Sequence, residues 1–364
     1  MSRFLQIFAN AQARIRANDA FQVKQMFDGR CARGGKIRSM KLNTGDKICV
    51  IAPSRSMAII SNEVKQVAIE NFSKLGLNVV FGKNIYEKDE VLSSSVQSRL
   101  EDLHEAFNDS SIKGIFTVIG GYNSNQLLSK IDYKLIKKNP KILCGFSDIT
   151  ALSNAIYAKT NLVTYYGPHF SSLGMKKGIE YTLEYLKKCF FSSSPYELKP
   201  VDNWSDDEWY MDQENRKFYK NEGYRIINEG SATGTLLGGN LCTFNLLQGT
   251  EYFPNIKDSI LLMEEDNLLG STSLVEFDRN LQSVIDCKYF SKVKGILIGR
   301  FQIESNITIE QLIKVIQSKK ELANIPIIAN MDFGHTTPIV TLPIGGNVKI
   351  EAKKGTTQIL IVKH

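Results

Sequence analysis

The sequence predicts an α/β protein with an N-terminal doubly wound, mainly parallel sheet domain and a smaller C-terminal α+β domain. Short apolar, β-branched runs alternate with helical stretches from residue 47 to about 164, which is typical of βαβ units covered on both faces. A polar, aromatic stretch at 192–224 interrupts this pattern, and a mixture of strands and helices follows it. We therefore expect domains at 40–195 and 233–364, joined by a long loop or linker at 196–232.

The first domain is expected to alternate strands and helices in order. The expected strands are 47–53, 77–82, 114–121 and 141–146, and the expected helical stretches are 62–74, 97–109, 126–131 and 148–160. In a doubly wound sheet, functional groups gather at the carboxyl ends of the strands, which is where Gly120, Gly121 and Ser147 fall.

The second domain is expected to mix strands with two helices and to close on a hairpin. The expected strands are 233–241, 259–265, 294–301 and 325–334, the helices lie near 274–286 and 308–320, and the hairpin spans 348–362 with a Lys-Gly turn. We find no internal repeat and no low-complexity tract.

The composition is that of an ordinary globular protein, with 364 residues, 43% of them hydrophobic and 23% charged. Apolar runs such as FTVIGG and SILLM end early, short of the about 18 residues that a membrane-spanning helix needs. The six cysteines occur singly, which favours buried thiols in a reducing compartment over a disulfide framework or a zinc site. With four histidines in the chain, a multi-histidine metal centre is not expected.

The positive charge is concentrated at the N-terminus. The net charge is +7, and residues 1–39 hold six Arg and two Lys against Asp19 and Asp28, so the remainder is nearly neutral. A neutral body argues against a nucleic-acid binder, which needs a basic face. We expect this extension to lie outside the fold, as an organelle-type presequence, a partner-binding amphipathic helix, or sequence translated ahead of Met40 from an upstream start or a vector.

Ser147 lies where the predicted strand KILCGF turns into a helix. Such a turn exposes a hydroxyl and directs the free N–H groups of the helix toward it. The G-x-S-x-G pattern of a nucleophile elbow is incomplete, because Ile149 stands where the second Gly belongs. The alternative interpretation is that Ser147 or Asp148 simply caps the helix.

The pair Gly120-Gly121 follows a predicted strand in the same way. Two glycines at a strand end let backbone N–H groups approach a phosphate or an oxyanion closely. The spacing is not that of a P-loop or a dinucleotide fingerprint, and a tight turn is the alternative.

Glu264 and His335 are the candidate partners of Ser147. Glu264 ends the run SILLM, with Glu265 and Asp266 after it, and His335 follows the run IPIIA in the segment FGHTTP. Taken alone, successive acids at the end of a strand are more often solvated, and a single histidine here is more often a hydrogen-bonded loop residue than a base. Together with Ser147, each stands at a strand end, as a Ser-His-acid site requires.

Six segments in order resemble the LD-carboxypeptidase family of serine peptidases, and they look most similar to its microcin C immunity branch. The segments are IGGYNSNQLL, KNPKILCGFSDITALSNAIYAKT, YGPHF, GTLLGGNL, SILLMEED and GHTTPIVTLPIG. The resemblance covers essentially everything after Met40.

The resemblance implies that Ser147 is the nucleophile, His335 the general base and then acid, and Glu264 the carboxylate that holds the imidazole. Glu265 remains an alternative for the third role, because adjacent acids cannot be separated by sequence alone. The chemistry implied is a two-step hydrolysis of an amide through an acyl-enzyme.

The resemblance also implies that the backbone N–H groups of Gly121 and Asp148 hold the oxyanion. One departure from the family concerns the glycine turn. Many cell-wall members look like R-G-G-Y-G at this turn, whereas here Ile119 replaces the Arg and Asn123 the last Gly.

Substrate contacts are implied at three further positions. The loop NWSDDEWYMDQENRKFY resembles the W-S-D stretch of the microcin-immunity enzymes, where a tryptophan stacks on the nucleotide part of a peptidyl-adenylate. Trp204 matches that position and Trp209 is the alternative. Asn123 and Asn240 are the other expected contacts.

We therefore expect a serine hydrolase that cleaves the amide between a peptidyl or aminoacyl group and a nucleotide-like moiety, giving self-immunity or detoxification toward microcin C-type compounds. The alternatives are an L,D-carboxypeptidase acting on muropeptide tetrapeptides and, in another class, a non-catalytic nucleotide-binding module. The expected protein is a cytoplasmic homodimer that uses no metal or organic cofactor and has no nucleic-acid or membrane partner.

Overall fold

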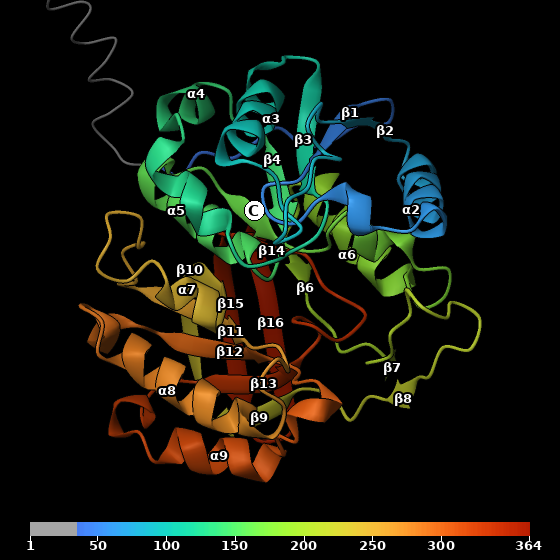
Figure 1. The fold of residues 1–364 in the computed structure, drawn as a ribbon. Coiled ribbons are helices and arrows are strands. Elements are labelled where there is room, and N and C mark those ends of the chain that lie inside the picture. The colour runs from blue at the N-terminus through green and yellow to red at the C-terminus, as the bar shows by residue number, and fades with distance from the viewer. Residues whose placement is uncertain (1–34) are drawn as a thin grey trace, which may run out of the picture. The chain divides into compact units, whose positions relative to one another are not determined.

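Two β-sheets organise the part of the chain that the computed structural model describes, residues 35–364 (Figure 1). Residues from Ile37 to His364 form one compact unit. The first sheet has the strand order β14-β5-β4-β3-β1-β2, and the second has the order β6-β16-β15-β10-β11-β12-β13-β9. The predicted fold class, an α/β chain with two domains, is confirmed.

The first sheet is parallel apart from its edge strand β14. Its strands are β1 (Lys47–Ile51), β2 (Asn78–Phe81), β3 (Ile112–Thr117), β4 (Ile142–Gly145), β5 (Thr164–Tyr166) and β14 (Leu342–Ile344). Its helices are α2 (Asn62–Lys74), α3 (Val96–Asn108), α4 (Tyr133–Lys138), α5 (Ile149–Thr160) and α6 (Glu180–Phe190). Helices α3, α4 and α5 lie to one side of this sheet in Figure 1, and α2 and α6 to the other.

The strand order creates a topological switch point between β1 and β3. Strand β2 lies on one side of β1, and β3, β4 and β5 follow one another on the other side. Ligands of open α/β sheets bind outside the carboxyl ends of the strands at such a point.

Local sequence explains the elements of this domain. All four residues of β4 are buried, as expected for a parallel strand covered on both faces. Ser61 and Ser95 begin α2 and α3 by accepting hydrogen bonds from the backbone N–H of Val64 and Ser98. Helix α5 is buried along most of its length because it contacts strands of both sheets.

The second sheet is mixed, with parallel strands at its centre and antiparallel strands toward both edges. Its strands are β6 (Tyr196–Glu197), β9 (Arg225–Asn228), β10 (Gly230–Asn240), β11 (Ser259–Glu264), β12 (Gly295–Gly299), β13 (Ile327–Met331), β15 (Asn347–Lys353) and β16 (Thr356–Lys363). Its helices are α7 (Leu241–Asn245), α8 (Ser273–Ile285) and α9 (Ile309–Gln317), and α8 and α9 are in contact. The predicted closing hairpin is the β15–β16 pair.

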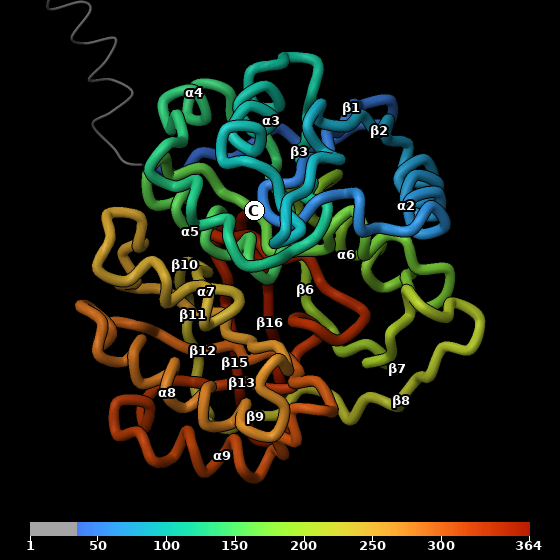
Figure 2. Tube along the Cα trace, viewed as in Figure 1, coloured from blue at the N-terminus to red at the C-terminus, as the bar shows by residue number. Residues whose placement is uncertain are grey.

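The structure differs from the expected segment pattern in three places. The range 196–232 contains short strands, of which β6 and β9 form the two edges of the second sheet. Strands β7 (Asn203–Trp204) and β8 (Tyr219–Lys220) of the same range pair with each other as a ribbon, which lies on the right in Figure 2. Strand β14 returns to the first sheet from the C-terminal part of the chain. The stretch 126–131 lies mostly in a 3-10 turn, Ser124–Lys130. Strands of two to four residues are too short to show a periodicity.

The expectation that residues 1–39 stay outside the fold falls mainly on residues 1–34, which lie outside the described residues. Ile37, however, donates a backbone hydrogen bond to Asn161 (2.8 Å) and accepts one from Val163 (2.8 Å). The folded unit therefore includes residues from Ile37 on, three residues before Met40.

Cys49, Cys144 and Cys189 are buried free thiols, as predicted, whereas Cys242 is exposed. In the described part of the chain, no helix has the length and apolar character needed to cross a membrane.

Candidate functional site

Ser147 occupies a strained turn between β4 and α5. Its φ of 58° lies in the left-handed region that a residue with a side chain rarely adopts. The sequence forces this turn because a buried strand ends at Gly145 and a helix begins at Ile149. The hydroxyl is thereby presented beyond the carboxyl end of the sheet.

A chain of hydrogen bonds connects Ser147 to His335 and Glu264. The Ser147 Oγ lies 3.1 Å from His335 Nε2, and His335 Nδ1 lies 2.8 Å from Glu264 Oε2. Glu264, 1% exposed, ends β11, and His335 follows β13, so the carboxyl ends of strands from both sheets meet here. With Nδ1–H donating to the carboxylate, Nε2 is free to accept the serine proton.

The electrostatics of His335 favour proton uptake. Burial disfavours the charged imidazolium, but the Glu264 carboxylate, with Asp266 and Glu265 nearby, outweighs burial and raises the pKa of His335 above its ordinary value. The arrangement can thus withdraw a proton from a serine hydroxyl and stabilise the resulting imidazolium.

Glu265 does not contact the imidazole. Its Oε1 accepts a hydrogen bond from Asn280 Nδ2 at 2.8 Å, and burial raises the pKa of Glu265 to about 8. The structure therefore brings Glu264, and not its neighbour, to His335.

Asp148 connects the turn of Ser147 to the glycine turn. Its Oδ2 accepts hydrogen bonds from Ser54 Oγ (2.6 Å), Asn123 N–H (3.1 Å) and Ser124 N–H (2.9 Å). Within residues 35–364, the backbone N–H groups of Asp148 and Gly121 have no hydrogen-bond acceptor. Two such groups near a serine hydroxyl are able to donate hydrogen bonds to an oxyanion.

Gly120 packs directly against Ser147. A Cβ at this position would lie 2.9 Å from Ser147 Cβ, 3.1 Å from Ser147 Oγ and 3.5 Å from His169 Nε2. His169 is buried beneath the turn with its Nδ1 2.7 Å from Thr117 Oγ1, and burial holds the pKa of His169 well below its ordinary value. A neutral histidine thus supports the glycine turn from below.

A cavity of about 450 Å³ opens over Ser147 and His335. Gly121 and Tyr122 form part of its wall on the side of the first sheet. The loop carrying Trp209 and the segment carrying Asp266 line it as well. This is the size of a small-molecule site.

Asn123 and Asn240, both expected to contact substrate, do not line this cavity. Asn123 Oδ1 accepts a hydrogen bond from Arg99 (3.0 Å), so its side chain holds the turn in place. Asn240 Oδ1 caps α7 by accepting from Thr243 N–H (3.1 Å). Asn123 is thus held by a side chain of α3, whereas within residues 35–364 the Nδ2 of Asn240 is buried without a hydrogen-bond partner, and the role of both residues as substrate contacts stays a prediction.

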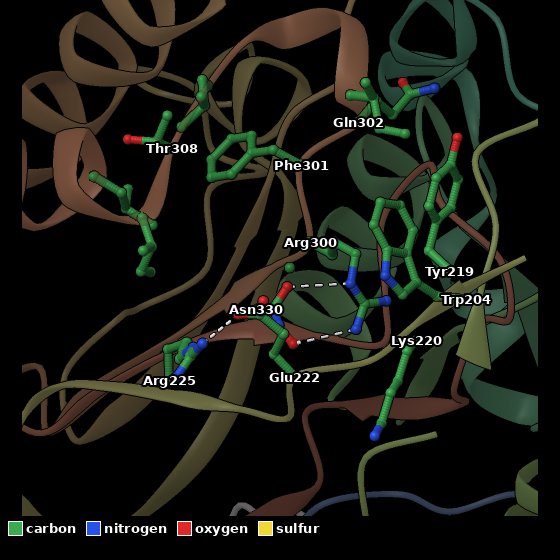
Figure 3. Close-up of a pocket in the computed structure, with 15 residues that line it drawn as sticks. Trp204, Tyr219, Lys220, Glu222, Arg225, Arg300, Phe301, Gln302, Thr308 and Asn330 are labelled. Carbon is green, nitrogen blue, oxygen red and sulfur yellow. Dashed lines mark hydrogen bonds and ion pairs between the residues drawn. The ribbon is translucent and has the colours of Figure 1, made fainter. Parts of the chain in front are cut away.

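Trp204 lies in a neighbouring cavity of about 430 Å³ and does not line the cavity of Ser147. Figure 3 shows its indole against Arg300, whose guanidinium carbon is 4.9 Å from the ring centroid, with Tyr219 beside it. Arg300 is held in turn by Asn330 (3.1 Å) and Asp332 (2.7 Å). Trp209, the alternative, is the tryptophan that lines the cavity of Ser147.

Arg55 lines the same cavity and was not among the residues predicted from sequence. It follows β1 at the switch point, so the rule that places functional groups at the carboxyl ends of parallel strands would have identified it. Within residues 35–364, no group of three His, Cys, Asp or Glu side chains is arranged to hold a metal ion.

Comparison with known families finds two matches. The family described as the LD-carboxypeptidase N-terminal domain matches residues 48–167, and the LD-carboxypeptidase C-terminal domain matches residues 233–350.

Similar proteins extend over nearly the whole chain. The putative carboxypeptidase YocD of Bacillus subtilis strain 168 is 55% identical over 324 residues, 89% of this chain and 99% of its own. The crystal structure of an MccF-like protein from Bacillus anthracis strain Ames is 55% identical, with a TM-score of 0.90 over 90% of this chain and 100% of that one. The microcin C7 self-immunity protein MccF in complex with aspartyl sulfamoyl adenosine is 29% identical, with a TM-score of 0.79 over 90% and 99%.

Proposed function

We propose that this chain, which belongs to the LD-carboxypeptidase family of serine peptidases, hydrolyses the amide between a peptidyl or aminoacyl group and a nucleotide-like leaving group. Such a reaction would provide self-immunity or detoxification toward microcin C-type compounds. The observation that carries the proposal is the hydrogen-bonded chain from Ser147 through His335 to Glu264 at the cavity.

In the proposed mechanism, His335 takes the Ser147 proton as the hydroxyl attacks the amide carbonyl. The N–H groups of Gly121 and Asp148 stabilise the oxyanion, and His335 then protonates the departing nitrogen to leave an acyl-enzyme. Water, activated by the same imidazole, releases the acyl group and restores Ser147, while Glu264 orients the ring throughout.

Two observations support a nucleotide-like leaving group. MccF, whose fold is shared, is described in complex with aspartyl sulfamoyl adenosine. The indole of Trp209 lines the cavity, and an aromatic face suits a nucleobase at about 1–3 kcal/mol per stacked base. We assign the stacking role to Trp209 and not to Trp204.

The second candidate is hydrolysis of the L,D bond of muropeptide tetrapeptides, which the description of the matching family favours. Both reactions use the same chemistry at the carbonyl and differ in the leaving group. A head-to-head digestion therefore separates them.

The test incubates purified enzyme with aspartyl sulfamoyl adenosine and with an L,D-tetrapeptide and follows the products by mass spectrometry. Ser147→Ala should lower turnover by up to about 10⁶-fold while retaining binding, and the exposed Ser110→Ala serves as the matched control. Both substrates intact after long incubation would refute the proposal. Binding without turnover in the unmodified protein would instead support the non-catalytic nucleotide-binding alternative.

The same proposal includes a homodimer, as the family resemblance implies, in the cytoplasm, as the singly occurring cysteines imply. Analytical ultracentrifugation and cell fractionation test these two points directly.

A further inference from the structure

Arg55 is the residue on which the further inference rests. It lies just beyond β1, at the switch point of the first sheet, and lines the cavity over Ser147. Its Nε donates to the carbonyl oxygen of Gly120 at 3.1 Å, which fixes the orientation of the guanidinium. Within residues 35–364, no carboxylate pairs with Arg55 and no acceptor bonds its terminal nitrogens; its guanidinium carbon lies 5.9 Å from the centroid of the Tyr122 ring. A half-buried guanidinium with its outer donors unused is prepared to bind an anion.

The position of Arg55 relative to the reacting atoms follows from Gly121. A Cβ on Gly121 would lie 2.9 Å from Arg55 Cγ, so the arginine side chain packs directly on the residue whose N–H is proposed to hold the oxyanion. Standard bond lengths put a group attached one atom beyond the scissile nitrogen within about 4 Å of the scissile carbon. Such a group is therefore within reach of Arg55 when the carbonyl is bound.

The other charges around the cavity are negative. Asp207 is neutralised by Arg216 at 2.9 Å. Four more carboxylates lining the cavity have no cationic partner in the described chain: Asp206, Glu208, Asp266 and Glu304. These carboxylates would repel an anionic group of the substrate, whereas Arg55 would attract it.

We propose that Arg55 binds an anionic group carried by the leaving amine, within two bonds of the scissile nitrogen, and thereby selects the substrate. The inference rests on the function proposed above. The carboxylate of a terminal amino acid is attached to that nitrogen through Cα, and the sulfonyl or phosphoryl group of an aminoacyl nucleotide is bonded to it directly. In both cases the oxygens that bear the negative charge lie within about 4 Å of the scissile carbon, and a pair of them matches the paired donors of a guanidinium.

Three substrates test the proposal: an L,D-tetrapeptide with a free terminal carboxylate, the same peptide as its terminal carboxamide, and aspartyl sulfamoyl adenosine. In the unmodified enzyme, kcat/KM for the free acid should exceed that for the carboxamide by about 10- to 100-fold, the usual range for a hydrogen-bonded charge. Arg55→Met should abolish this ratio by raising KM for anionic substrates, with kcat within about threefold. Arg55→Lys should retain part of the preference, because it keeps the charge but not the paired donors.

Lys217→Met is the matched control: it removes an exposed cation that does not line the cavity, and it should leave all three substrates unaffected. The sulfamoyl substrate distinguishes the source of the anion, since its KM rises in Arg55→Met only where that group occupies the site. An unchanged acid-to-amide ratio in Arg55→Met overturns the proposal, and so does an equal fall in kcat for all three substrates.

Failure of the proposed function gives a different result. If the unmodified enzyme cleaves none of the three substrates, calorimetry with Ser147→Ala, alone and combined with Arg55→Met, measures binding directly. Equal dissociation constants of the anionic ligands for the two proteins then overturn the role of Arg55. Weaker binding by the double variant supports it independently of turnover.

Discussion

The substitution Gly120→Ala tests whether the glycine turn sets the position of the nucleophile. The backbone of Gly120 is not in the left-handed region, so alanine meets no conformational barrier of its own. The added methyl would stand 2.9 Å from Ser147 Cβ, about 0.5 Å inside the 3.4 Å at which ordinary contacts begin. Either Ser147 or the turn must move.

The expected loss follows from that displacement. Ser147 Oγ is already 3.1 Å from His335 Nε2, and a shift of about 0.5 Å either lengthens this contact or bends it. A 1 Å misplacement of a reacting group costs about 100-fold in rate, so we expect a fall of about 10- to 100-fold. Overpacking should also lower the free energy of unfolding by about 1–3 kcal/mol.

The assay is the rate at which a fluorophosphonate labels Ser147, followed by intact mass, because it needs no knowledge of the natural substrate. Gly114→Ala is the matched control, since it lies on β3, the strand that precedes the glycine turn, and its added methyl would contact Ile48 at 3.3 Å, away from Ser147. Urea unfolding of both variants shows whether the fold is intact. Labelling of Gly120→Ala at the unmodified rate, with the fold preserved, would refute this reasoning.

Four further outcomes are expected. Glu264→Gln should lower kcat by about 10⁴-fold, because the amide cannot orient and charge-stabilise the imidazolium, and steady-state kinetics showing less than a tenfold change would contradict this. The pKa of His335 is raised above 6.5 and catalysis needs the neutral imidazole, so kcat/KM should rise with pH through a midpoint above 6.5. Glu264→Gln should move that midpoint to lower pH, because the carboxylate that raises the pKa is removed. The same midpoint in the variant and the unmodified enzyme would argue against the carboxylate as the cause. Trp209→Ala should raise KM for aspartyl sulfamoyl adenosine at least about fivefold, whereas Trp204→Ala should leave it unchanged, and the reverse order would return the stacking role to Trp204. Asp148→Asn should reduce the free energy of unfolding in urea by about 1–3 kcal/mol, since one charged acceptor of three buried hydrogen bonds is lost, and an unshifted transition would show that the turn does not depend on that charge.

Most of the fold could be predicted because parallel strands buried on both faces leave continuous apolar runs. The helix expected at 62–74 is α2 with the same bounds, since Ser61 supplies a recognisable cap. The edge strands could not be predicted. Strands β6 and β9 are two and four residues long, and their pairing depends on partners far along the chain.

The choice between Glu264 and Glu265 shows what sequence leaves open at the site. Successive side chains along an extended chain point to opposite faces, so Glu264, the last residue of β11, and Glu265, the next residue, are expected to point in different directions. Which face meets the histidine depends on how β11 packs against the first domain. In the structure Glu264 meets His335, and Glu265 turns to Asn280 on α8.

The sequence also leaves open which of Trp204 and Trp209 enters the cavity, because this depends on a backbone pairing that fixes the chain between them. Ser205 and Thr337 exchange two backbone hydrogen bonds of 2.8 Å, which fixes the loop two residues beyond His335. On one side of this pairing, Trp204 is held in the β7–β8 ribbon against Tyr219. On the other side the chain turns over Ser147 and carries Trp209 into the cavity. A pairing of residues 132 positions apart leaves no local signal, so a motif match could locate the loop but not the side chain that meets the ligand.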